Sequence, residues 1–521
     1  MNSAGPAQTA AAEAKREGAA GMSHREVLEA MSGLLLAMFV AILSSTVVSA
    51  ALPKIIADIG GGQSAYTWVV TATLLAMTIS TPIWGKLADL FARKQLIQAG
   101  IVIYIAGSVL AGFATSSAWL IGCRAIQGVG VGALTALVQV ILSDLVSPRE
   151  RGRYMGYLGA VFGVGTVAGP VIGGLLTDGL GWRWCFFVGV PFALAALVVL
   201  QRTLHLPARK RDDVYIDTLG ATLIGAGVAA ILIWVSLAGK NFDWIGWQTA
   251  AFVGAGIVLL IAAVVVERRA EDPLIPLDLF ENRTVVLAVI ASVAVGIAMF
   301  GTTVFLTQYM QLARGYSPTE SGLLTIPLVF GLFGASTLSG RLIARTGRYK
   351  RILLLGALLL ALGLALMGLI DDRTSLALIA LFMVIVGVGV GMLMQNLILA
   401  VQNTVPPEEI GAGSALIAFF RSLGGAIGVS ALGAVLSSKV SSSLSEGGGE
   451  GTAGGGIPDL STLPDPVKAA VEHAYGTGVA EIFLVAAPMG IVAFAALWFL
   501  NERKLGTKSG IELSGGPGAA R

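Results

Sequence analysis

Two arginines lie deep inside long apolar runs of this chain. Arg124 falls within LIGCRAIQGVGVG (Leu120–Gly132) and Arg421 within ALIAFFRSLGGAIG (Ala415–Gly428). A guanidinium in hydrocarbon costs at least about 2.5 kcal/mol on insertion scales, so each should face a polar cavity or a partner. Arginine keeps its proton, so Arg124 can shift the pKa of a neighbouring acid but cannot itself carry an exchanged proton. We predict that both arginines charge one central cavity from opposite sides; the alternative for Arg124 is a purely structural ion pair.

Amide side chains accompany these charges. Gln127 follows Arg124 by three residues, so it shares its helix face and could bond either a substrate or the guanidinium. In MQNLILAVQNTV (Met394–Val405), Gln395 and Asn396 sit within an apolar helix, each repeated seven residues on as Gln402 and Asn403. These amides either line a substrate cavity or tie helices together.

Aromatic side chains offer a second kind of cavity wall. Trp68 and Phe420, which follows Phe419, could stack on a flat or cationic group. Packing against a neighbouring helix or against lipid is the alternative for each.

Other chemistries find no support. There is no GxxxxGK[ST] nucleotide-binding motif, since Lys86 and Lys240 follow glycines but precede Leu and Asn. The three histidines (His24, His205 and His473) fall outside the central parts of the apolar runs. No nucleophile, base or metal cluster occurs at catalytic spacing, so we expect no enzyme, no metal and no cofactor. Cys123 and Cys185 lie far apart in apolar surroundings and are predicted to be packing residues.

The elements that position these residues are membrane-spanning helices. The 521 residues are 55% hydrophobic and 12% charged, against about 25% charged in soluble chains. Apolar runs of about 20 residues recur, so the sequence predicts an all-α, multi-pass membrane protein. The fourteen predicted helices are 31–53, 65–86, 95–115, 118–142, 154–178, 184–206, 217–238, 246–267, 284–309, 319–343, 351–370, 375–404, 410–437 and 477–501.

Positive charge predicts the orientation. An even number of spans places both termini on one side, and the Lys/Arg clusters lie in the turns of that side, as at Arg93–Lys94 and Arg209–Arg211. The opposite turns carry isolated cations such as Lys54. By the positive-inside rule both termini are cytoplasmic.

The chain divides into two similar halves. GKLADLFARK (Gly85–Lys94) and GRLIARTGRYK (Gly340–Lys350) each follow an apolar helix and enter a cytoplasmic turn. The first motif follows the second predicted helix and the second motif follows the tenth. In two six-helix halves the second motif would follow the eighth helix, so the sequence predicts that two helices are inserted between the halves. The predicted parts are a disordered tail (1–30), an N-terminal six-helix bundle (31–206), two inserted helices (207–267), a C-terminal bundle (268–501) with a partly disordered extracellular loop (about 438–476), and a cytoplasmic tail (502–521).

A glycine-rich helix stands at the centre of the first half. In GAVFGVGTVAGPVIGG (Gly159–Gly174), Gly165, Gly169 and Gly173 recur every four residues, so one helix face allows close backbone approach. Pro170, followed later by Gly174, should kink this helix. A smooth, bent helix suits a moving pore wall; simple packing of two helices is the alternative.

These motifs together resemble the major facilitator superfamily, and within it the fourteen-helix drug:proton antiporters of the EmrB/QacA type. Gly85, Asp89, Arg93 and Lys94 look like its cytoplasmic loop signature, and the segment around Arg124 resembles its helix 4 signature. GVGTVAGPVIGG is similar to the helix 5 signature of exporters. The resemblance implies two six-helix bundles plus two inserted helices around a central cavity, with the loop residues acting as a conformational latch.

The chain departs from this pattern at several positions, among them Leu90 and Ala92, where the family usually has a basic residue and a glycine, and Ser49, which replaces an Asn. Ser44, in ILSSTVVSAALP (Ile42–Pro53), occupies the position where the family usually has an Asp, so the acid that would couple transport to protons is missing. Gly189, in WRWCFFVGVP (Trp182–Pro191), replaces a common Asn. Asp144, Asp178, Asp217 and Glu481 lie near helix ends and are candidates for interfacial residues as much as for the proton carrier. Two buried cations and few acids favour an anionic, zwitterionic or neutral cargo at least as much as a cationic one.

The resemblance implies a proton-coupled efflux transporter of amphipathic small molecules in the plasma membrane. Its expected partners are the cargo, protons and the lipid bilayer, without nucleic acid, and we expect a monomer driven by a proton gradient. Ser44, Trp68, Gln127, Gln395, Asn396 and Phe420 are the predicted cavity residues. Export of an endogenous lipid, metabolite or self-made antibiotic is one alternative, and a membrane sensor or scaffold that does not transport is the other.

Overall fold

The computed structural model describes residues 24–59, 63–146, 148–204, 218–238, 242–270, 273, 276–406, 409–446, 465–503 and 505. Within these ranges the regular secondary structure is helical, and one isolated bridge joins Ala238 and Phe242. The helices of the first part are α2 (His24–Asp58), α3 (Gln63–Leu90), α4 (Arg93–Gly112), α5 (Ser117–Leu145), α6 (Pro148–Gly179), α7 (Trp184–Phe187), α8 (Gly189–Thr203), α9 (Thr218–Leu237) and α10 (Trp247–Glu267).

The second part begins with a short 3₁₀ turn and contains one π-helical turn. Its elements are η1 (Leu277–Glu281), α11 (Arg283–Gln308), η2 (Tyr309–Ala313), α12 (Pro318–Leu324), α13 (Ile326–Thr346), α14 (Lys350–Met367), α15 (Leu376–Gln402), α16 (Ile410–Glu446) and α17 (Asp465–Trp498).

Thirteen helices among the described residues are long and apolar enough to cross a membrane. The fourteenth predicted span corresponds to α9, whose apolar segment Leu219–Val235 is shorter. The all-α membrane architecture is thus confirmed. By the length of its apolar segment, α9 is the predicted span with the weakest support.

Side-chain caps explain where several helices begin. The Ser116 hydroxyl accepts from the Trp119 N–H at the start of α5, and Asn282 accepts from the Thr284 N–H at the start of α11. Ser317 and Glu320 form a reciprocal capping box on α12. Such caps satisfy N–H groups that a helix leaves without intrahelical partners.

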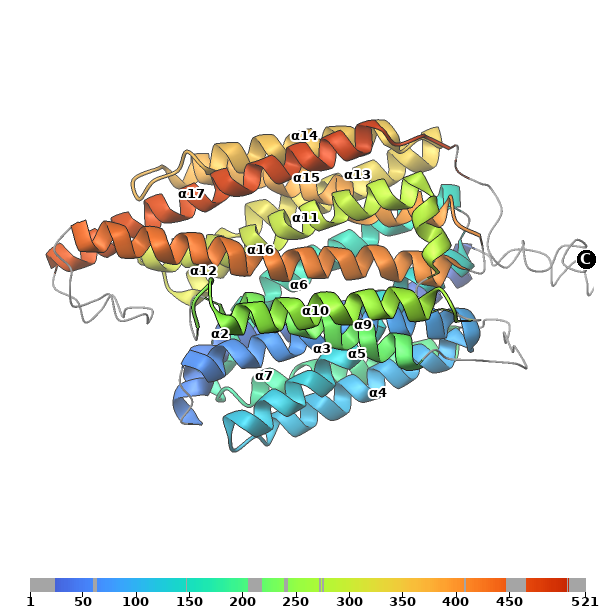
Figure 1. The fold of residues 1–521 in the computed structure, drawn as a ribbon, viewed down its shortest axis with the longest axis horizontal. Coiled ribbons are helices and arrows are strands. Elements are labelled where there is room, and N and C mark those ends of the chain that lie inside the picture. Colours follow the sequence, from blue (N-terminus) through green and yellow to red (C-terminus); the bar gives the residue numbers. More distant parts are fainter. Residues whose placement is uncertain are drawn as a thin grey trace, which may run out of the picture.

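The helices run side by side along the long axis of the molecule, with the N-terminal half on one side and the C-terminal half on the other (Figure 1). The two halves meet along two seams, α3 against α16 and α6 against α13. We call the end of the bundle at which α2 begins and α17 ends the termini end, and the other the opposite end. Val27, Leu145 and Leu204 pack in one apolar cluster at the termini end.

The inserted helices α9 and α10 lie over the first seam. Ile224, Val228 and Leu232 of α9 pack with Phe419 of α16, and Ile79 of α3 joins the same cluster. α10 lies against α9, and only Gly256, Ala263 and Glu267 of its residues are buried. The inserted pair therefore covers the α3–α16 seam.

Helices extend beyond two of the predicted boundaries. The N-terminal tail was expected to reach residue 30, but α2 begins at His24. The predicted loop 438–476 is helical at both ends, since α16 continues to Glu446 and α17 begins at Asp465. Helices can continue through Ser and Ala residues beyond their apolar segments, so boundaries predicted from apolar runs alone fall short of the true helix ends. The Gly-rich part, 447–464, lies outside the described residues.

Candidate functional site

Arg124 is fully inside the N-terminal half and bonds its predicted neighbour. Its Nη1 donates to the Gln127 Oε1 at 2.5 Å, and its Nε donates to the Val69 carbonyl of α3 at 3.4 Å. The Gln127 Nε2 in turn donates to the Ser108 Oγ of α4 at 2.7 Å. Arg124 is 2% exposed, and no carboxylate pairs with it among the described residues. Amide and carbonyl oxygens thus solvate the charge.

Tyr104 completes this polar cluster, and glycine makes room for it. The Tyr104 hydroxyl has Ser44 and Ser108 among its polar neighbours. A Cβ at Gly189 would collide with that hydroxyl. The Gly at 189, which departs from the family pattern, therefore fits the Tyr104 ring. The Ser44 hydroxyl is buried beside that of Tyr104.

Arg421 lies at a different depth. Its Nη1 donates to the Met394 carbonyl of α15 at 3.2 Å. Met394 precedes Gln395, which bonds Gln139 of α5. Because Gln139 follows Arg124 by 139 − 124 = 15 residues on α5, about 22 Å of helix separate the two polar groups. The structure thus contains two polar layers, one around each arginine, where the sequence predicted one shared cavity.

The glycine-rich helix α6 has two faces that lack side chains and lie close to another helix. The sequence predicted only one of these faces. Gly165 and Gly169 face α2, where added Cβ atoms would collide with Ile42 and Thr46, and the Thr46 Oγ1 donates to the Gly165 carbonyl at 3.1 Å. A second row, which includes Gly159, faces α13 of the other half. There an added Cβ would collide with the Ser336 hydroxyl.

The remaining residues of this motif lie toward the opposite end. Pro170 stays within one continuous helix, and its ring packs against Gly322 of α12. Gly174 faces the Thr319 hydroxyl, while the Gly173 carbonyl accepts from the Thr177 hydroxyl at 2.6 Å. α6 therefore contacts the second half along most of its length.

The loop signature (Gly85, Asp89, Arg93 and Lys94), which we call the latch signature, includes an arginine that pairs with a carboxylate outside it. The sequence did not assign this carboxylate to the signature. The Arg93 guanidinium pairs with Asp144 at the end of α5, and its Nε donates to the Ala88 carbonyl at 2.9 Å. The adjacent Lys94 donates to the Gln201 carbonyl at 2.8 Å. Asp144, which the sequence offers as an interfacial residue as much as the proton carrier, pairs with the first residue of α4 and so joins α5 to α4.

The first residue of the signature makes a contact between the halves. A Cβ at Gly85 would collide with Ala415 of α16. Asp89 lies in the last turn of α3, and its side chain is outside the described residues. The latch signature thus combines an ion pair inside one half with backbone packing against the other.

The amides of α15 tie helices together, the second of their two predicted roles. The Gln395 Oε1 accepts from the Gln139 Nε2 at 2.8 Å, which joins the two halves. The Asn396 Nδ2 donates to the Ser339 Oγ of α13 at 3.1 Å and to the Met392 carbonyl at 2.7 Å. Asn396 therefore ties helices together within its own half.

The predicted aromatic wall is a packing contact at Phe420. Its ring is edge-on to Phe419 at 5.1 Å and to Phe280 at 6.5 Å between centroids, and it belongs to the cluster beneath α9. Trp68 is partly buried near the start of α3. Neither ring lines the recess that lies between the halves.

That recess is bounded by helices of both halves. About 370 Å³ of space lies between its walls when the open mouth and the gaps between side chains are counted, and its interior has room for little more than one water molecule. The lining side chains are mostly apolar: Phe162, Gly163, Thr166, Met299, Thr302, Thr303, Leu328, Val329, Leu332, Val386, Gly387 and Val390. None of the predicted cavity residues lines it. The threonines that do line it could not be recognised from the sequence, because a threonine in an apolar helix looks the same whether it lines a cavity or packs against a neighbouring helix.

One hydroxyl in the recess has no partner. The hydroxyls of Thr166 and Thr303 donate to carbonyls one turn back, at 2.8 Å each. The Thr302 Oγ1 is buried and makes no hydrogen bond within the described part of the chain. Among the lining hydroxyls it is therefore the one available to hydrogen-bond a polar group on an otherwise apolar guest.

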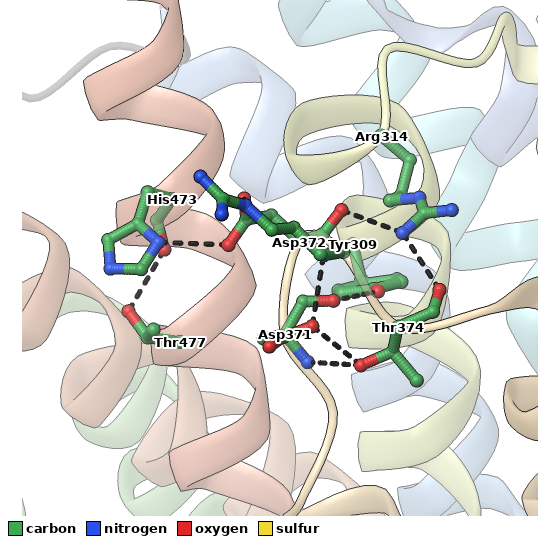
Figure 2. A network of polar contacts seen from close by, with 8 residues as sticks. Tyr309, Arg314, Asp371, Asp372, Thr374, His473 and Thr477 are labelled. Atoms are coloured by element: carbon green, nitrogen blue, oxygen red, sulfur yellow. Dashed lines mark hydrogen bonds and ion pairs between the residues drawn. The ribbon is translucent and has the colours of Figure 1, made fainter.

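A polar network closes the opposite end of the C-terminal half (Figure 2). The Tyr309 hydroxyl donates to the Asp371 carbonyl at 2.6 Å, and the Arg314 Nη1 donates to the Asp372 carbonyl at 2.7 Å. The His473 Nδ1 lies 2.9 Å from the Asp372 Oδ1. Contacts from η2 and the residue after it, from α17 and from the α14–α15 turn thus make this end one unit.

The same turn holds a carboxylate whose titration is perturbed. The Thr374 hydroxyl and the Arg373 N–H both donate to Asp371 and lower the pKa of its carboxyl below the ordinary value. The bonds to its carboxylate therefore contribute stability above the ordinary pKa of an aspartate and are lost as the pH falls through the lowered value. In the described ranges, no three His, Cys, Asp or Glu side chains gather to hold a metal ion.

Comparison with known proteins identifies the family. The family model of the Major Facilitator Superfamily matches residues 34–215 and 216–429. The chain is 34% identical over 416 residues to the multidrug transporter protein MdtP of Bacillus subtilis, covering 80% of this chain and 76% of that protein. It is 29% identical over 490 residues to multidrug resistance protein 3 of the same organism, covering 91% and 95%.

A solved structure agrees at the level of the fold. The proton:xylose symporter XylE superposes with a TM-score of 0.63 at 15% identity, covering 94% of this chain and 99% of that chain. The predicted resemblance is confirmed: this chain belongs to the Major Facilitator Superfamily.

Proposed function

We propose that this transporter exports amphipathic small molecules by alternating access. The observation that carries the proposal is the apolar recess bounded by α6 of one half and α11, α13 and α15 of the other. A guest between two halves is exposed to one side or the other when the halves rock. The relatives named multidrug transporter and multidrug resistance protein support an efflux direction.

The recess supports a particular kind of cargo. Its walls bury apolar surface, while the unpartnered Thr302 hydroxyl provides one hydrogen bond. The buried guanidiniums of Arg124 and Arg421 lack carboxylate partners in the described ranges, which favours neutral, zwitterionic or anionic amphiphiles over cations.

The orientation and the energy source complete the proposal. The termini end is cytoplasmic in the plasma membrane, because Lys and Arg concentrate in its turns. The transporter works as a monomer and exchanges cargo for protons without a cofactor. Ser44 stands where the resemblance implies an acid, and Asp144 is paired with Arg93.

Purified protein in liposomes tests this function directly. An imposed pH gradient should drive neutral and anionic fluorescent amphiphiles, and substrate should in turn evoke proton flux. Cargo movement that ignores the gradient would contradict antiport, and absence of movement for every probe would contradict export of amphiphiles.

Two threonine variants test the recess itself. Thr302→Val keeps the side-chain shape and removes the unpartnered hydroxyl, so transport of hydrogen-bonding probes should fall while that of purely apolar probes is kept. Thr303→Val is the matched control, because its hydroxyl already donates to the Met299 carbonyl. Equal effects of the two variants on the probes would place the cargo elsewhere.

A further inference from the structure

Four buried polar residues join the two halves near the termini end. The Gln139 Nε2 of α5 donates to the Gln395 Oε1 of α15 at 2.8 Å. The Gln402 Nε2 donates to the Gln139 carbonyl at 3.4 Å and to the Ser414 Oγ of α16 at 2.7 Å. We call Gln139, Gln395, Gln402 and Ser414 the amide clasp. Each of them is 1–3% exposed.

Close backbone packing accompanies the clasp. Gly85 of α3 lies against Ala415, the residue next to Ser414, with no room for a Cβ between them. The Gly411 carbonyl lies 3.1 Å from the position that this Cβ would take. Helices α3 and α5 of one half thus meet α15 and α16 of the other, and side chains and backbone together close this end.

The clasp is only partly satisfied. The Gln139 Oε1 and the Gln395 Nε2 are buried and have no partner among the described residues, so the amide pair makes one of its two possible hydrogen bonds. In an open state both atoms would bond water, which lowers the free-energy cost of opening. One neutral hydrogen bond shifts such an equilibrium by roughly 2- to 10-fold. A bond of this size biases a conformational equilibrium without locking it.

We propose that the amide clasp is the gate at the termini end, and that its two bonds between the halves break each time the recess opens to that side. This proposal rests on the alternating-access function proposed above. The neighbouring Asn396 makes its bonds within the C-terminal half, so within this polar run the gate includes Gln395 and Gln402 but not Asn396.

Access of a small reagent tests the gate without any cargo. In full-length protein with Cys123 and Cys185 replaced by serine, Ala136→Cys places a buried thiol one turn beyond the clasp on α5. A membrane-impermeant maleimide added from the termini side should label this thiol roughly 2- to 10-fold faster when Gln395→Leu removes the clasp bond. Asn396→Leu, the matched control, should leave the rate unchanged. An unchanged rate in Gln395→Leu, or an equal increase in Asn396→Leu, would overturn the proposal.

A reversible cross-link supplies the second test. Gln139→Cys with Gln395→Cys, joined by a short bis-methanethiosulfonate reagent, should lose transport and regain it when the link is reduced, whereas each single cysteine should be unaffected by the reagent. Transport at the uncross-linked rate would show that the clasp need not open. If no probe moves in any variant, the proposed function fails, while the labelling rates still decide the gate.

Discussion

Replacing Arg93 with alanine should destabilise the N-terminal half, because the change leaves a buried carboxylate without its cation. The side chains of Arg93 and Asp144 are 3% and 13% exposed, so water screens the pair little. Removing one partner of a buried ion pair costs roughly 3–5 kcal/mol. We therefore expect the unfolding equilibrium constant to rise at least about a hundredfold, since each 1.4 kcal/mol is about tenfold.

The double replacement separates the charge from the shape. Arg93→Met with Asp144→Leu removes both charges, and neutral replacement of a buried pair is often without cost or stabilising. The double variant should therefore be more stable than Arg93→Ala. Reversible unfolding in mixed micelles, followed by tryptophan fluorescence, measures the free energy of unfolding for each member of the cycle.

Lys94→Ala is the matched control at the neighbouring position. Its ammonium donates to the Gln201 carbonyl in an exposed setting, so the change should stay within about 1 kcal/mol. Equal losses for Arg93→Ala and Lys94→Ala, or a double variant no more stable than the single one, would refute the reasoning that the pair is buried and coupled.

Three further changes test other contacts, by transport in liposomes and by yield of correctly inserted protein. Gly159→Leu should block transport without preventing insertion, because the new side chain collides with α13 of the other half, whereas Gly334→Leu at an open position of α13 should be tolerated. Gly189→Ala should reduce thermal stability by collision with the Tyr104 hydroxyl, and adding Tyr104→Phe should restore it; no rescue would contradict this contact. Arg124→Ala should abolish transport while insertion is kept, and full activity would contradict its role.

Local patterns predicted the parts of the site that depend on a single helix. The bond between Arg124 and Gln127 follows from their three-residue spacing, and the close approach at Gly165 and Gly169 follows from their four-residue repeat. Membrane spans followed from apolar runs, since a spanning helix must be apolar over about 20 residues.

Contacts between distant segments could not be predicted in this way. Asp144 and Arg93 are 51 residues apart and come together only when α4 packs on α5. The pairing of Gln139 with Gln395 spans 256 residues and depends on how the halves meet. The unpartnered state of the Thr302 hydroxyl depends on the same packing, because most threonines in apolar helices bond their own backbone.

The inserted helix α9 makes the two seams of the molecule unequal. It covers the α3–α16 seam, whereas no inserted helix covers the α6–α13 seam among the described residues, and α6 and α13 carry exposed apolar side chains such as Val164 at 57% and Phe330 at 70%. Any rocking of the halves must displace a helix on one side and only acyl chains on the other. The thickness and fluidity of the surrounding membrane therefore act directly on motion at the α6–α13 seam. At the α3–α16 seam they act through α9.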